Sequence, residues 1–336
     1  MSRTVLHVVA TRGVGLAARQ LALLAGGAGT DVVHKVALLV HDPSQAAFFT
    51  AHEMTVFQRE RASTLVPALF AGSALSPFGF VSKRWLSELA RRAHADALHA
   101  HDALAAEIAG AVAEIESLPL FRSESDPRAT RISRGSVARV QRFVAHSVAV
   151  QRAMLRAAPL LAPKMVLART SIELPHPALP DPEPHDPLRV HVVGVPQRGD
   201  GAVLEILRHH AELVAADKDE RTTLAASDVV IAAGSVPLGA DAEEPVELAV
   251  LRGLAHGRPA VVVDEGGLPE LVAGSTDGAS CGVVLDRPAE RDAWVSALLA
   301  VTGFGAAARA RAKEHDATKM RAFYHDLYAG VVKRRR

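Results

Sequence analysis

The second half of the chain contains LAASDVVI (residues 224–231), GLAHGRPAVV (253–262) and DEGGLPELV (264–272), in that order. The runs DVVIAA at 228–233 and PAVVVD at 259–264 are short and apolar, as buried parallel strands are. A helical pattern over 245–256 separates them. The stretch therefore predicts a strand–helix–strand step of a parallel α/β sheet.

Two glycines follow the second of these strands. Gly266 and Gly267 come just after Asp264, where that strand should end. Ligands of open α/β sheets bind beyond the carboxyl ends of the strands, and glycine lets a backbone approach a ligand closely. Taken alone, the pair is equally typical of a tight turn.

Together, the three segments resemble the donor-binding domain of family 4 glycosyltransferases. In that family an AADVFV strand precedes a helix ending in A-x-G-x-P-V-V and a D-x-G-G-x-P-E loop, and the order here is the same. The resemblance implies the GT-B architecture, an α/β fold in which two Rossmann-like parallel-sheet domains face each other across a cleft. Strand and helix patterns alternate along the whole chain, which fits this class.

The resemblance also implies a reaction. We expect a retaining, metal-independent transfer of a sugar from a nucleotide-diphosphate sugar to a hydroxyl of a glycan, lipid or small-molecule acceptor, with no further cofactor. A phosphate oxygen of the donor would help to deprotonate the acceptor. The implied catalytic residues are Glu244, which would bind sugar hydroxyls, and His101, near the reacting carbon. The implied donor-binding residues are Gly194, Arg198, Glu247, Arg252, Gly266, Gly267 and Leu268.

The predicted donor helix departs from the family pattern. In the family, two glutamates separated by seven residues frame this helix, and a Gly-Phe-Gly-like stretch follows the first. Glu244 matches the first glutamate, but Arg252 stands at the second position, where a guanidinium cannot accept hydrogen bonds from ribose hydroxyls. Pro245, Val246 and Glu247 replace the glycine-rich stretch, and the Glu247 carboxylate would compete with a diphosphate for the positive end of the helix.

The segment between the prolines and residue 228 is also shorter than in the family. It lacks the basic loop that grips the donor phosphates, and GVPQRG at 194–199 offers only Arg198 as a substitute, unless that side chain is simply solvated. These departures favour an alternative in which the chain is a catalytically inactive GT-B homologue that acts as a binding or scaffold protein.

The first half resembles the same family more weakly. ADALHAHD at 95–102 is similar to a D-V-V-H-A-H-D strand end, in which the second histidine, here His101, faces the cleft. FVAHS at 143–147, followed by a helical pattern, is similar to an I-A-V-S strand. The alternative for His101 is a buried structural histidine.

A glycine-rich turn follows the first predicted strand, VLHVVA at 5–10. Gly13, Val14 and Gly15 belong to a G-x-G-x-x-A pattern, and the resemblance implies that they form an acceptor or phosphate loop. The same pattern, with Asp42 as a ribose partner, would also suit an NAD-dependent oxidoreductase, and a plain tight turn is a third interpretation.

Proline content suggests the domain boundaries. Six prolines lie within residues 175–187, which predicts an interdomain linker because proline fixes φ and removes a backbone donor. We therefore expect an N-terminal acceptor-side domain at 1–174 and a C-terminal donor-binding domain at 188–305. Residues 306–336 would form a helix that crosses back to the first domain and a basic tail.

Composition and charge bear on the partners, metal sites and location that the chain could have. A net charge of +1 predicts no nucleic-acid partner, and Cys281 as the one cysteine excludes an internal disulfide. Asp217-Lys218-Asp219 matches a D-x-D metal pattern but lies in a polar stretch typical of solvated side chains, and no H-E-x-x-H occurs, so we expect no metal site. Six arginines within 122–142 and KRRR at 333–336 indicate either a solvated loop and tail or a surface for peripheral contact with an anionic membrane. Without a signal peptide or a membrane-length apolar run, the expected location is the cytoplasm, with the inner face of the membrane as an option.

Overall fold

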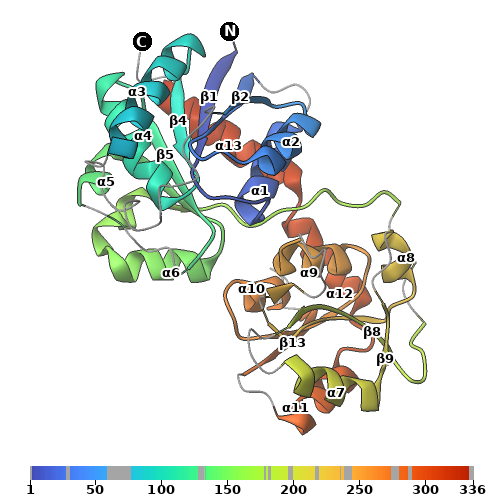
Figure 1. The fold of residues 1–336 in the computed structure, drawn as a ribbon. Helices are drawn as coiled ribbons and strands as arrows, with labels where there is room; N and C mark the ends of the chain where they lie inside the picture. Colours follow the sequence, from blue (N-terminus) through green and yellow to red (C-terminus); the bar gives the residue numbers. More distant parts are fainter. Residues whose placement is uncertain are drawn as a thin grey trace. The chain divides into compact units, whose positions relative to one another are not determined.

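The computed structural model describes residues 2–27, 31–58, 77–127, 132, 134–177, 179–180, 183–195, 200–215, 219–234, 236–237, 244–273, 280–286 and 290–332. The chain forms two compact units (Figure 1). Residues 1–169 and 320–336 make up the first unit, and residues 170–319 make up the second.

The first unit is built on a seven-stranded parallel sheet with the order β3-β2-β1-β4-β5-β6-β7. Six of these positions follow the strand order of doubly wound nucleotide-binding folds. The strands are β1 (Arg3–Val9), β2 (Val32–Leu38), β3 (Thr55–Gln58), β4 (Ala97–Ala100), β5 (Leu120–Glu124), β6 (Val140–Ala145) and β7 (Met165–Leu167).

Alternate side chains of these strands enter two hydrophobic clusters, one on each face of the sheet. Leu6 and Val8 pack in the cluster that also contains residues of α3, α4 and α6. Val5 and Val9 pack in the other, with residues of α1, α2 and α13. The helices are α1 (Leu16–Ala25), α2 (Pro43–Ala51), α3 (Pro77–Arg92), α4 (Ala103–Ile115), α5 (Arg134–Arg139), α6 (Val148–Ala157), the 3-10 helix η1 (Pro159–Lys164) and α13 (Ala317–Val332).

Helix α13 completes the first unit from residue 320 onward. Tyr324 and Tyr328 are each 2% exposed and pack with Val5 and Val9. The two tyrosines therefore belong to the core of the first unit although about 150 residues of the second unit precede them in the chain.

The second unit has a six-stranded sheet in the described residues. Strands β8, β10, β12 and β13 are parallel, and β11 and β9 pair with the outer side of β8. The strands are β8 (Arg189–Val195), β9 (Glu212–Leu213), β10 (Val229–Ala232), β11 (Val236–Pro237), β12 (Ala260–Val263) and β13 (Gly282–Leu285). The helices are α7 (Asp200–His210), α8 (Glu220–Ala225), α9 (Val246–Ala255), α10 (Leu268–Val272), α11 (Arg291–Ala300) and α12 (Gly305–Glu314).

The proline-rich segment packs on the second unit and is not a free linker. Leu179 is 7% exposed, and its N–H lies 3.3 Å from His256 Nδ1. The Arg258 guanidinium donates to the carbonyl of Pro180 at 2.8 Å, and the Asp228 carboxylate accepts from the N–H of His185 at 3.2 Å. Side chains of the second unit thus satisfy the backbone groups that proline leaves unpaired, and the division between units falls at residue 169.

Among the described residues, Arg122 does not contribute to the predicted basic surface at 122–142. Arg122 lies in β5, is 1% exposed, and donates to the Glu124 carboxylate at 3.1 Å. Arg139 pairs with Glu114, whereas Arg128 and Arg131 lie outside the described residues, as does the basic tail at 333–336. Peripheral membrane contact stays a prediction.

No single described helix is long and apolar enough to cross a bilayer. Helices α11 and α12 have the length and apolar character for a crossing only as a pair, and that pair is bent by 91°.

Candidate functional site

The predicted donor glycines lie at the carboxyl end of β12. Gly266 is exposed, has φ +58°, and has open space where a side chain would begin. Gly267 is the N-cap residue of α10, and Leu268 is buried as the first residue of that helix. The loop therefore offers bare backbone at the edge where ligands of parallel sheets bind, and Leu268 anchors it.

Gly194 has a packing reason of its own. A Cβ on this residue would lie 2.3 Å from the carbonyl oxygen of Gly234 and 2.7 Å from Val246 Cγ1. The ends of β8 and β10 and the start of α9 thus meet at Gly194, which brings these elements together at the edge that carries Gly266.

Glu244 and Arg252 form an ion pair at the start of α9. Arg252 Nη1 lies 2.9 Å from Glu244 Oε1 and 2.8 Å from Glu220 Oε2. Helix α9 begins at Val246, so Pro245 is its N-cap and not its first residue as predicted. Arg252 follows Glu244 by eight positions and lies in the last turn of α9, from which its guanidinium reaches back to the carboxylate that precedes the helix.

Further carboxylates surround this pair. Glu247 lies in the first turn of α9, where burial and the nearby Glu265 raise the pKa of its carboxyl. The exposed Asp264 follows β12 directly. Arg198, the predicted phosphate ligand, lies outside the described residues. Within the described part of this edge, carboxylates outnumber the single Arg252 guanidinium, and that charge balance opposes a diphosphate.

Asp228 and Arg258, from the segments at 224–231 and 253–262 that resemble the donor domain, have structural roles at the opposite edge of the same sheet. Asp228 precedes β10 and accepts from the N–H of Arg189 at 2.8 Å and lies 2.9 Å from His185 Nδ1. Arg258 is 2% exposed and donates to the carbonyl of Leu224 at 2.8 Å. These residues tie the proline-rich segment and α8 to the amino ends of the strands.

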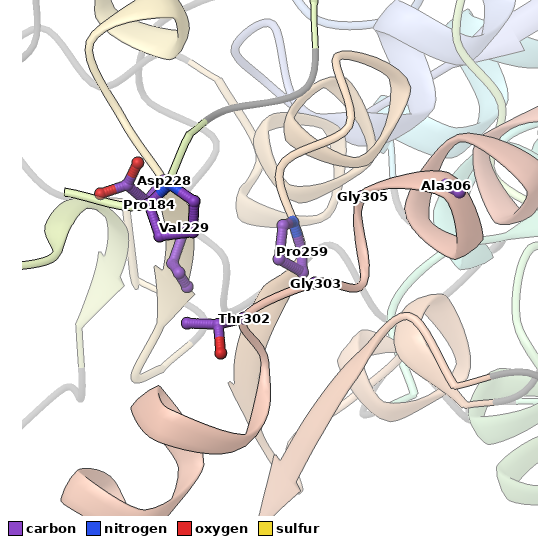
Figure 2. A pocket seen from close by; sticks show the side chains of 8 residues that line it. All are labelled: Pro184, Asp228, Val229, Pro259, Thr302, Gly303, Gly305 and Ala306. Atoms are coloured by element: carbon purple, nitrogen blue, oxygen red, sulfur yellow. The ribbon is translucent and has the colours of Figure 1, made fainter.

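Figure 2 shows a pocket at that amino edge. Asp228, Pro259, Thr302 and Gly303 are among the residues that line its volume of about 260 Å³. The Asp228 carboxylate is already engaged by the backbone and His185. This pocket therefore lies at the wrong end of the sheet for the predicted donor site.

In the first unit, two aspartates hold the Gly13-Val14-Gly15 loop. Gly13 has φ +81°, and its N–H donates to Asp42 Oδ2 at 2.7 Å. Asp42 also caps α2 by accepting from the N–H of Gln45 at 3.0 Å. Burial alone would raise the pKa of Asp42, but these hydrogen bonds outweigh that effect and lower it. Asp42 thus stabilises the loop instead of presenting a free carboxylate to a ribose.

Asp102 ties the same loop to α4. Its Oδ2 accepts from the N–H groups of Ala10 at 2.7 Å and Thr11 at 3.1 Å, and its Oδ1 accepts from Ala105 at 2.8 Å. The aspartate of the HAHD segment is therefore the N-cap of α4 and a brace for the turn after β1.

His101 lies just beyond β4, but its side chain is only 7% exposed. His101 Nε2 lies 2.9 Å from His7 Nδ1. Burial, followed by the charges of His146 and His34, lowers the pKa of His101 to about 3, so the imidazole is neutral. The structure places this ring in a cluster of histidines that the sequence interpretation did not include.

That cluster contains His7 and His34 in addition to His99 and His101. A signal was present in the sequence, because histidines at alternate positions of apolar strands point to one face of a sheet. The buried Arg122–Glu124 pair was also missed; burial raises the pKa of the Glu124 carboxyl and the Arg122 guanidinium opposes this.

Solved structures share this fold over almost the entire chain. A glycosyltransferase from Rickettsia africae ESF-5 aligns with a TM-score of 0.73 at 12% identity, covering 99% of both chains. Anabaena HepE in complex with UDP aligns with a TM-score of 0.71 at 14% identity, covering 98% of this chain and 100% of that one. The lipopolysaccharide outer core galactosyltransferase WaaB, in its apo form, gives 0.70 at 10% identity over 98% and 99%.

These likenesses confirm the predicted fold class: two parallel-sheet α/β domains of the GT-B glycosyltransferase type. No protein-family profile matches the sequence, and no curated protein does. Membership of family 4 stays a prediction that rests on the segments within 224–272.

Proposed function

We propose that the chain is a glycosyltransferase that transfers a sugar from a nucleotide-diphosphate sugar to an acceptor hydroxyl, with retention of configuration and without a catalytic metal ion. The observation that carries the proposal is the Gly266-Gly267 loop, with Gly266 exposed at the carboxyl end of β12. This loop comes next in sequence to the strand–helix–strand step that resembles the donor domain. The shared fold supports it, because Anabaena HepE was solved with UDP and with UDP-glucose.

In this proposal the donor binds at the carboxyl edge of the second sheet. The diphosphate lies against the backbone at Gly266 and Gly267, and open space surrounds the position where a side chain would begin at Gly266. Glu244 accepts hydrogen bonds from sugar hydroxyls, as ionised carboxylates do well. To do so it must share its oxygens with Arg252, whose Nη1 lies 2.9 Å away.

Glycine variants test the position of the donor. Gly266→Ala should weaken binding of UDP about tenfold or more, because a methyl group would enter the phosphate path and φ +58° disfavours a side chain. Gly303→Ala is a matched control, since Gly303 has φ +94°, equally open space, and a place at the amino edge. Equal losses of UDP affinity in the two variants would show that backbone strain alone causes the effect, and would contradict the proposed position of the donor.

The reaction itself is tested with purified protein and a panel of nucleotide-sugars. Calorimetric titration with UDP, GDP and ADP should first identify one nucleotide bound in the micromolar range. Turnover of its sugar conjugates is then followed by NMR, which reports the anomeric configuration of the product. We expect retention and an unchanged rate when Mg²⁺ and Mn²⁺ are omitted. Inversion, or a strict need for added Mg²⁺, would contradict the proposed mechanism.

A second candidate function is a catalytically inactive GT-B homologue that binds or scaffolds a partner. The observation that favours it is that Arg252 pairs with both Glu244 and Glu220. The position of the family's second glutamate therefore holds an arginine whose charge is already neutralised by two carboxylates. Folded protein that binds none of the three nucleotides would support this candidate and overturn the first.

A further inference from the structure

A histidine cluster lies on the face of the first sheet that α13 covers. His7 on β1 is the register partner of His99 on β4. His101 follows His99 by two residues and so points to the same face. His7, His99 and His101 are 0%, 0% and 7% exposed, and the face around them is largely apolar and includes Tyr324 and Tyr328.

Nitrogen atoms of these three residues converge. One ring nitrogen from each lies within 4.8 Å of the other two. His7 Nδ1 and His101 Nε2 are 2.9 Å apart. Two nitrogens bound to one tetrahedral zinc ion, at about 2.0–2.1 Å each, lie about 3.3 Å apart. A shift of a few tenths of an ångström would therefore turn this contact into two metal–ligand bonds.

Burial of the three imidazoles favours their uncharged form. Neutral imidazole keeps a lone pair on one nitrogen, whereas the protonated ring has none to offer.

Outer partners that orient the rings are also in place. His7 Nε2 lies 2.8 Å from His34 Nδ1, and His99 Nδ1 lies 2.7 Å from the Tyr328 hydroxyl. Hydrogen bonds of this kind fix the tautomer of metal-binding histidines. His99 Nε2 also lies 2.7 Å from Ser123 Oγ, which in turn lies 3.3 Å from the Tyr324 hydroxyl. His99 can therefore exchange one of its two hydrogen bonds for a metal ion.

We propose that His7, His99 and His101 bind one divalent transition-metal ion of the zinc or cobalt type. Three imidazole nitrogens without a carboxylate suit zinc, cobalt or copper and do not suit Mg²⁺ or Ca²⁺. The nearby Asp102 carboxylate is engaged by Ala10, Thr11 and Ala105. The ion links β1 to β4 and, through Tyr328, to α13, which gives it a structural role.

This proposal is independent of glycosyl transfer, and it assigns His101 to a metal instead of to the reacting carbon. The sequence contains no compact metal-binding motif because the ligands come from two strands that are adjacent only in the folded sheet. A metal-free network, in which His7 and His101 share one proton, is the competing arrangement.

The test is a titration of tag-free, chelator-dialysed full-length protein with Co²⁺. We expect one equivalent to bind and to produce visible d–d absorption that Zn²⁺ abolishes, together with a higher Tm. His101→Gln should lose the absorption, and His34→Gln should weaken binding about 10- to 100-fold as an outer-shell change. His325→Gln, on the exposed surface of α13, should bind like the unmodified protein.

X-ray absorption of the unmodified protein loaded with one equivalent of Co²⁺ keeps the proposal testable if His101→Gln fails to fold. Three imidazole nitrogens at about 2.0–2.1 Å are expected. Absence of visible absorption and of a Tm change, carboxylate-only coordination, or Co²⁺ binding that His101→Gln leaves intact would each overturn the proposal in favour of the metal-free network.

Discussion

The Arg252 guanidinium, in the last turn of α9, lies 2.9 Å from the carboxylate of Glu244, which precedes that helix. Its other partner, Glu220, lies at 2.8 Å in α8. The three side chains are 25–42% exposed, so the network contributes about 1 kcal/mol or less to stability. Its main consequence is for ligands, because it holds Glu244 by a cation and removes a hydrogen-bond acceptor from position 252.

Arg252→Glu should therefore improve nucleotide binding. The change restores an acceptor for ribose hydroxyls, and hydrogen bonds to a charged group contribute about 1.5–3 kcal/mol. We expect this gain to outweigh the added repulsion of the diphosphate, because charges at these partly exposed positions are screened by solvent and salt. We expect the Kd for UDP to fall about tenfold, measured by calorimetry. The control is Arg189→Glu at the start of β8, because the Arg189 side chain is as exposed as that of Arg252 and also pairs with a carboxylate, that of Glu212. Unchanged affinity in Arg252→Glu would show that this ion pair does not limit donor binding.

Gly194→Ala should destabilise the second unit. A Cβ would lie 2.3 Å from the Gly234 carbonyl oxygen, and neither backbone can give way without disturbing the β8–β10 pairing. Overpacking of this kind costs about 1–3 kcal/mol. Urea denaturation measures the loss. Gly330→Ala in α13, where the added methyl group meets nothing within 4 Å, should be neutral or stabilising by up to about 1 kcal/mol. A neutral Gly194→Ala would contradict the tight packing described above.

His146→Gln should reduce the pH dependence of the free energy of unfolding of the first unit below pH 6.5. Burial lowers the pKa of His146 to about 4, against 6.5 in the unfolded chain. The unfolded state therefore binds more protons between these values, and the free energy of unfolding falls as pH decreases from 6.5 towards 4. One histidine contributes at most about 1.4 kcal/mol per pH unit.

The measurement is urea unfolding from pH 8 to pH 4.5, followed by Trp85 fluorescence in a Trp294→Phe background, since Trp294 belongs to the second unit. The pH-dependent part of the difference between the parent protein and its His146→Gln variant should vanish above pH 7 and grow below 6.5. A difference that does not vary with pH would show that His146 matters only for packing.

Cys281 should be unreactive in the folded protein. The thiol is 0% exposed, and burial raises its pKa to about 11. Thiolate is the reactive form, so a disulfide reagent at pH 8 should modify Cys281 many times more slowly than it does in urea-unfolded protein. Equal rates would indicate that the region around β13 opens readily. Cys281→Ser, which cannot react, provides the baseline.

Long apolar runs made much of the fold predictable. Strands β10 and β12 and helix α9 follow the pattern read from 224–263, because burial on both faces requires continuous valine and alanine. Strand β5 was missed because Arg122 and Glu124 make it look polar. The two charges neutralise each other inside the unit, which no local pattern reveals.

The candidate site was predictable only in part, for the same physical reason. Gly266 and Gly267 could be predicted because they follow the apolar run that forms β12, and Arg252 because of its spacing from Glu244. The contact of Arg252 with Glu220 depends on how α8 packs. The histidine cluster depends on the strand order β2-β1-β4, which pairs segments far apart in the sequence.

The contribution of residues 320–332 to the first core has a consequence for biosynthesis. A ribosome adds about 5–20 residues per second, so roughly 150 residues of the second unit take on the order of 10–30 s to make. Until Tyr324 and Tyr328 emerge, the nascent sheet exposes the face that contains His7 and His99. The first unit to be translated therefore cannot complete its core until the second unit has been made, and until then the apolar face that α13 covers is open to other binding partners.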